Sequence, residues 1–140
     1  MVMEVFYCGE AEMSKRIEVT NAIIGLLKKK VPEANWNASI TGVNRSSKLE
    51  GTVTCDRIEY NYEAYDVLTA KAVYSIYIVD MNSIEGVDDI ADKAFVLLNN
   101  SDLAGTITEG LVSKIIYGTA QGKQNAGVAL LEYVVEYEEE

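Results

Sequence analysis

The chain has 140 residues, with 12 basic and 22 acidic side chains and therefore a net charge of −10 at pH 7. Its length fits one domain, and 49% hydrophobic with 24% charged residues is typical of a globular protein. The absence of histidine excludes a Ser-His-Asp triad, a histidine general base and a histidine-ligated metal. We therefore expect a single domain over residues 1–140, with residues 1–12 as a possible N-terminal arm.

The acidic charge is concentrated near the C-terminus, where residues 131–140 carry five glutamates and no basic residue. Such a surface repels nucleic-acid phosphates and anionic membranes, which argues against a sequence-reading DNA-binding protein. Two interpretations stay open: residues 138–140 form a solubilising acidic tail, or they form an acidic surface past which DNA moves without binding. The N-terminus lacks the features of a signal peptide, and no apolar run approaches the length of a membrane span, so a cytosolic chain is expected.

The first predicted element is a helix over residues 14–30, in which apolar residues recur at helical spacing. Ser14 can cap its first turn, and Pro32 prevents its continuation. Three lysines at residues 28–30 occupy its last turn, where cations suit the negative end of the helix dipole. A nucleic-acid patch is the less economical interpretation of these lysines.

Extended segments follow at residues 36–41 and 51–62, separated by a turn-rich loop at 42–47. In the second segment, alternation places Val53, Cys55, Arg57 and Glu59 on one face and Thr54, Asp56, Ile58 and Tyr60 on the other. Residues 70–79 form the clearest strand, because they are β-branched and aromatic and largely apolar on both faces. This strand is predicted to lie centrally in the sheet.

A second amphipathic helix is predicted from residue 82 or 83 to residue 99, followed by a hairpin of strands at 110–118 and 127–137. One face of the last strand is apolar throughout: Ala129, Leu131, Tyr133, Val135 and Tyr137. The predicted fold is α+β, with a mixed, mainly antiparallel sheet of about five strands and two helices packed on one face. The element order is helix, three strands, helix, two strands.

The residues provide no recognisable catalytic or cofactor signature. The segment from Gly118 to Lys123 departs from a phosphate-binding loop in its glycine spacing and falls at a strand-to-strand turn. The acidic pairs Asp56/Glu59 and Asp88/Asp89 are better explained as solvated surface, and a cysteine nucleophile lacks its usual base. No calcium-loop pattern is present, and two cysteines cannot complete a four-thiolate zinc site. We therefore predict no catalytic residues, no metal, no cofactor and no enzymatic activity.

The nine tyrosines allow two interpretations. Tyrosine is an ordinary strand former, and it is also enriched in the buried cores of protein interfaces. Tyr133 and Tyr137, which share a face of the last strand, are accordingly candidates for an interface. The last strand has apolar residues on both faces, although Glu132 and Glu136 make the second face mixed, which suggests that something beyond the chain's own helices covers it.

The helix RIEVTNAIIGLLKKKVP, the group of strands, the second helix and the closing strand GVALLEYVVEYEEE together resemble a known family. They are similar to the tail terminator and tail-completion proteins of tailed bacteriophages and of phage-derived contractile particles. The resemblance spans residues 14–137 and lies in size, element order and the closing hydrophobic-acidic strand, without an invariant motif.

The resemblance implies a non-enzymatic virion protein that forms a hexameric ring, caps the tail tube and joins the tail to the neck or head. Its implied partners are further copies of itself and tube, sheath or neck proteins, and DNA passes through the ring without specific binding. Assembly takes place in the host cytoplasm, with no role for a membrane. Alternative interpretations are another neck or tail-tube component, or a small cytosolic α+β ligand-binding protein or enzyme.

Candidate functional residues follow from charge and from the predicted loops. Arg45 and Lys48 in the first long loop and Lys123 at the hairpin tip could dock acidic neighbouring rings or be ordinary solvated residues. With Tyr133 and Tyr137 they complete the set of interface candidates. Candidates for the lining of a channel are Glu138, Glu139 and Glu140.

Overall fold

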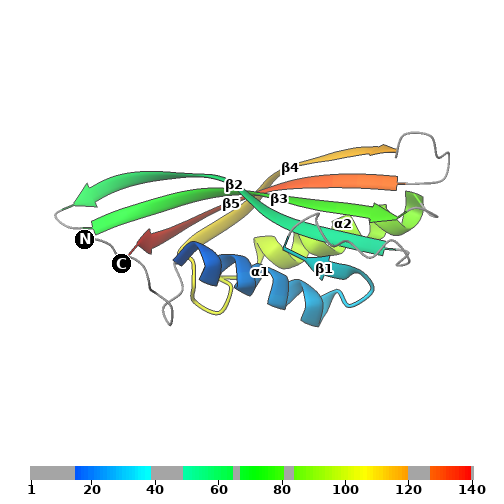
Figure 1. The fold of residues 1–140 in the computed structure, drawn as a ribbon, viewed down its shortest axis with the longest axis horizontal. Helices are drawn as coiled ribbons and strands as arrows, with labels where there is room; N and C mark the ends of the chain where they lie inside the picture. The colour runs from blue at the N-terminus through cyan, green and yellow to red at the C-terminus, as the bar shows by residue number, and fades with distance from the viewer. Residues whose placement is uncertain (1–14, 39–48, 65–66, 81–83, 120–126, 140) are drawn as a thin grey trace.

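The computed structural model describes residues 15–38, 49–64, 67–80, 84–119 and 127–139. These residues form α1 (Lys15–Lys30), β1 (Asn35–Asn37), β2 (Leu49–Ala64), β3 (Val67–Asp80), α2 (Ile84–Asn99), β4 (Glu109–Thr119) and β5 (Gly127–Glu139). The sheet has the order β1-β2-β3-β5-β4, with β1 parallel to β2 and the other pairs antiparallel (Figure 1). The predicted α+β fold, its element order and the central position of β3 are confirmed.

Both helices cover the same face of the sheet (Figure 1). α1 packs against β1 and β2, and α2 packs against β3, β4 and β5. The core lies between the layers, and the face of β5 predicted from alternation is completely buried there: Ala129, Leu131, Tyr133, Val135 and Tyr137. None of the helices in the described ranges is both long and apolar enough to cross a lipid bilayer.

The connection from α1 into β1 is built around Trp36. α1 ends at Lys30, and the amide of the next residue, Val31, donates to the Leu27 carbonyl at 2.8 Å before Pro32. The Trp36 ring is buried, and its Nε1 donates to the Val31 carbonyl oxygen at 2.8 Å. Its register partner in β2 is Gly51, where an added Cβ would lie 2.2 Å from the ring. Only glycine therefore allows this close approach.

The first strand is shorter than predicted. β1 covers residues 35–37 instead of 36–41, and it pairs with residues 50–52 alone. Residues 39–41 of the predicted strand, and the whole predicted loop at 42–47, lie outside the described residues.

A β-bulge at Asp56 changes which residues of β2 face the helices. In the pairing with β3, Cys55 is opposite Tyr74 and Arg57 is opposite Val73, so Asp56 has no partner. One extra residue reverses the alternation of the strand. Beyond the bulge it is Ile58 that packs against the core, so the prediction that Arg57 and Glu59 share the face of Cys55 is wrong.

The acidic tail expected at residues 138–140 does not begin at residue 138, because β5 continues to Glu139. Glu138 and Glu139 belong to β5 and pair with Thr69 and Leu68 of β3. The Glu138 side chain is exposed, and Glu140 lies outside the described residues. The strand continues because β3 extends far enough to pair with it.

Candidate functional site

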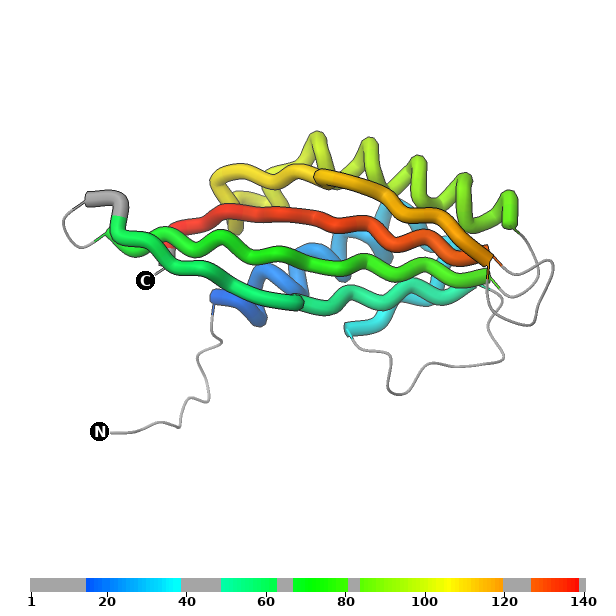
Figure 2. Tube along the Cα trace, turned by 90° about the horizontal axis from the view of Figure 1, so that it is seen from above, coloured from blue at the N-terminus to red at the C-terminus, as the bar shows by residue number. Residues whose placement is uncertain are grey.

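The second face of the sheet, turned away from both helices, carries a broad set of apolar side chains. Register aligns them in rows across the strands: Val79 with Val128, Tyr77 with Leu130 and Ile116, and Val73 with Val134 and Leu111. We call these eight residues the outer apolar patch. Figures 1 and 2 show that α1 and α2 lie on the opposite face, so the chain's own helices leave the patch uncovered.

Burial varies strongly within the outer apolar patch. Leu111 is 56% exposed and Ile116 52% exposed, both on β4. Val73, in the middle of β3, is only 3% exposed, although it lies outside the core cluster beneath the helices. The patch therefore has a packed centre with exposed apolar side chains beside it, an arrangement typical of a surface that binds another protein.

A polar row crosses the outer apolar patch beside the bulge at Asp56 of β2 and a bulge at Ser113 of β4. Ser75 of β3 is opposite Glu132 of β5. Ser75 donates a hydrogen bond to the carboxylate of Asp56, the bulged residue of β2. Ser113, the bulged residue of β4, donates to Glu132 Oε1 at 2.6 Å. These contacts fix both bulges at the level of the central Tyr74–Tyr133 pair.

One end of the outer face is acidic. Lys71 of β3 is opposite Glu59 of β2 and Glu136 of β5, and Glu109 of β4 continues the same row. Three carboxylates and one amine thus share one row, and Glu138 lies two residues further along β5 on the same face. The outer face therefore combines an apolar area with an acidic end.

β4 forms an edge of the sheet. Near its start, the amide of Val112 donates to Asn99 Oδ1, at the end of α2, at 2.7 Å. From Lys114 to Thr119 the side chains are exposed apart from the half-buried Ile115. Such an edge presents backbone donors and acceptors that can pair with another strand.

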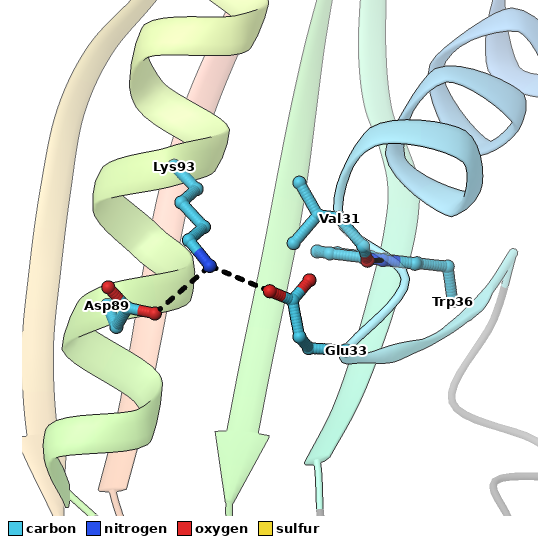
Figure 3. Close-up of polar contacts among 5 residues, drawn as sticks. All are labelled: Val31, Glu33, Trp36, Asp89 and Lys93. Carbon is cyan, nitrogen blue, oxygen red and sulfur yellow. Dashed lines mark hydrogen bonds and ion pairs between the residues drawn. The ribbon is translucent and has the colours of Figure 1, made fainter.

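An open groove of about 470 Å³ separates the end of α1 from α2. Apolar Val31, Val96 and Leu97 share its lining with three charged residues, Lys30, Asp92 and Lys93. Lys93 Nζ lies 2.7 Å from Glu33 Oε2 and 3.3 Å from Asp89 Oδ2, so it links α2 to the segment before β1 (Figure 3). The hydrogen bond between Lys93 and Glu33 lowers the pKa of Glu33 and raises the pKa of Lys93.

Two potential nucleophiles among the described residues, Cys55 and Tyr74, have raised pKa values, which favours their neutral forms. Burial raises the pKa of the Cys55 thiol, which is half-buried, and raises the pKa of Tyr74 to about 12. Tyr74 shares a hydrogen bond of 2.7 Å with Thr20 Oγ1 and donates to the Arg16 carbonyl at 3.2 Å. Across the described ranges, no three acidic or cysteine side chains gather as metal ligands do.

Of the predicted interface residues, the structure describes Tyr133 and Tyr137, both in β5. Tyr133 is 0% exposed and Tyr137 is 1% exposed, because both point under the helices into the chain's own core. This corrects their assignment as interface residues, since a neighbouring subunit cannot reach them. Arg45, Lys48 and Lys123 lie outside the described residues, as does Glu140.

Leu111 and Ile116, the most exposed members of the outer apolar patch, were missed by sequence reasoning. The bulge at Ser113 places them on one face although they are five residues apart, an odd spacing that regular alternation assigns to opposite faces. The available signal was the mixture of apolar and polar residues in GLVSKIIYG, which fits neither a buried nor a half-buried regular strand.

The sequence matches no protein-family model and no curated protein. A solved structure described as "Virion of native gene transfer agent (GTA) particle" contains a chain of similar fold, with a TM-score of 0.62. The match covers 86% of this chain and 94% of that chain at 12% sequence identity. At this identity, the similarity establishes a common fold.

Proposed function

We propose that the chain is a structural, non-enzymatic protein of a phage-like virion, and that it acts as a tail terminator. In this role, copies of the chain form a ring that caps the tail tube and joins it to the neck or head. The observation that carries the proposal is the outer apolar patch, which the chain's own helices leave uncovered. The similarity in fold to a component of a gene transfer agent virion supports the same role.

In a ring, each subunit binds the next one head to tail, so two different surfaces of the chain must bind each other. The ring closes when the rotation from one subunit to the next adds up to a full turn. The patch on the outer sheet face supplies one apolar surface. The acidic end of the same face, with Glu136 and Glu138, supplies charge for a channel. Multiplied around a ring, a net charge of −10 per chain repels DNA and allows it to pass without binding.

Light scattering and negative-stain images of the same fraction, alone and mixed with tail tubes, test the proposal. We expect rings of about six subunits, as closed cyclic symmetry allows, or density at the tube ends. Binding along the tube instead of at its ends would indicate a tube or neck component. A compact single chain that ignores the tubes would overturn the proposal.

A matched pair of substitutions tests the patch itself. The double variant Leu111→Glu/Ile116→Glu places charge in the patch and should convert rings into single chains. Val96→Glu is the control, because Val96 is 59% exposed on α2, away from the outer sheet face. Equal assembly of both variants would exclude the patch as a subunit contact.

The channel is proposed to pass the end of β5, at which residues 138–140 carry three glutamates. Replacing all three with glutamine removes three negative charges per subunit at the proposed lining. Assembly should persist while DNA passage through the completed tail becomes slower. Unchanged assembly together with unchanged DNA passage would refute this placement.

A further inference from the structure

The exposed edge of β4 is suited to bind an additional strand. Its segment Lys114–Thr119 forms the outer edge of the sheet, with Ile116 and Tyr117 about half exposed. Natural sheets usually protect such an edge with charges, proline or a covering segment. Here one charged residue, Lys114, and the bulge at Ser113 are the protective features between residues 113 and 119.

The N-terminal segment MVMEVFYC, residues 1–8, has the composition of a strand. Valine, phenylalanine and tyrosine favour extended backbone, and the segment contains neither glycine nor proline. Its single charged side chain is Glu4, opposite in sign to Lys114, the single charged side chain of Lys114–Thr119. Among the described residues, Lys114 has no ion-pair partner.

α1 and β4 lie toward opposite edges of the sheet. α1, which follows the N-terminal segment, packs against β1 and β2, whereas β4 lies at the other edge (Figure 2). Residues 9–14 connect the segment to α1 and can span about 20 Å when extended. A head-to-tail contact through this segment would require the α1 side of one copy to face the β4 edge of the next copy.

We infer that residues 1–8 of one copy add to the free edge of β4 in a second copy as an extra strand. Main-chain hydrogen bonds along Lys114–Thr119 supply the affinity, and pairing of Glu4 with Lys114 selects the register. The contact is heterologous, so it propagates in one direction and closes into a ring. This inference rests on the proposed function, because it specifies how the subunits of the ring are joined.

Disulfide trapping in the full chain tests the inference, with Cys8 as the native probe. Single cysteines are introduced at Ile116, Tyr117 or Thr119, and the protein is oxidised under assembly conditions. At least one variant should form disulfides between chains, visible as a ladder on denaturing, non-reducing gels. Replacing Cys8 with serine should abolish the ladder, and a cysteine at Val96 should not produce one.

A charge exchange provides the second measurement. Lys114→Glu should lower the mass measured by light scattering from that of the ring to that of single chains, and Glu4→Lys should do the same. The double variant Glu4→Lys/Lys114→Glu should restore the ring, because the opposite charges face each other again. Restoration separates loss of this contact from misfolding.

Three results would overturn the inference: no disulfide from any edge cysteine, a disulfide within one chain only, or a ring that tolerates Lys114→Glu. If rings still cap tail tubes in those cases, the proposed function stands and the subunits contact each other through a different surface. If the ladder forms but the chain never binds tube ends, the contact between residues 1–8 and β4 is correct and the terminator role is wrong.

Discussion

Tyr74 and Tyr133 lie directly opposite each other on β3 and β5, yet their hydroxyl groups have different surroundings. Both rings are fully buried. The Tyr74 hydroxyl contacts Thr20 Oγ1 at 2.7 Å and the Arg16 carbonyl at 3.2 Å, which ties the sheet to α1. The Tyr133 hydroxyl is buried with no hydrogen-bond partner among the described residues.

This difference predicts opposite effects of removing the two hydroxyl groups. Tyr74→Phe should lower the free energy of unfolding by about 1 kcal/mol, because it removes the hydrogen bonds of the Tyr74 hydroxyl with Thr20 and with the Arg16 carbonyl. Tyr133→Phe should leave stability unchanged or raise it by up to about 1 kcal/mol, because it removes a polar group that is buried without compensation. Urea unfolding of both variants measures the difference, and a larger loss in Tyr133→Phe would contradict it.

The same two tyrosines predict a loss of stability at alkaline pH. Burial raises the pKa of Tyr74 and of Tyr133 from 10 to about 12, so the fold favours the neutral phenols. Their contribution is complete below pH 10, the unfolded value, and is lost as the pH rises toward 12. Urea midpoints at several pH values should fall over this range, and less steeply in Tyr133→Phe. Identical slopes in the variant and the original chain would argue against the raised pKa of Tyr133.

Gly51→Ala should strongly destabilise the protein. The added Cβ would lie 2.2 Å from the Trp36 ring, which is buried and cannot rotate away freely. Overpacking of this kind costs about 1–3 kcal/mol. Trp36 is the single tryptophan, so a red shift of its fluorescence reports the displacement directly. Gly118→Ala is the matched control, because nothing lies within 4 Å of its added Cβ; similar losses in both variants would contradict the steric explanation.

Asn99→Ala should lower the free energy of unfolding by about 1 kcal/mol. Its Oδ1 accepts the Val112 amide at 2.7 Å, and truncation leaves this part-buried donor of β4 without its acceptor. Asn100→Ala, whose side chain donates to the Val96 carbonyl at an exposed position, is the control and should cost less. Hydrogen exchange of the Val112 amide should accelerate in Asn99→Ala alone, and equal exchange in both variants would count against the bond.

Local patterns in the sequence were sufficient for the helices, the long strands and the α+β class. The helical spacing from Ile17 to Val31 and the stop at Pro32 depend on neighbouring residues, and the structure places α1 accordingly. The buried face of β5 was equally predictable, because alternation in a regular strand needs no information from other elements. Central placement of β3 followed from apolar residues on both of its faces.

Contacts between distant residues decided the rest. The bulges at Asp56 and Ser113 insert one residue each, and only the pairing with β3 and β5 reveals where alternation reverses. Apolar alternation likewise cannot tell which face the helices cover, so Tyr133 and Tyr137 were assigned to an interface although they belong to the core. The outer apolar patch arises from the register of three strands. The approach of Trp36 to Gly51 depends on the parallel pairing of β1 with β2, which a local sequence pattern cannot predict because the two residues are far apart in the chain.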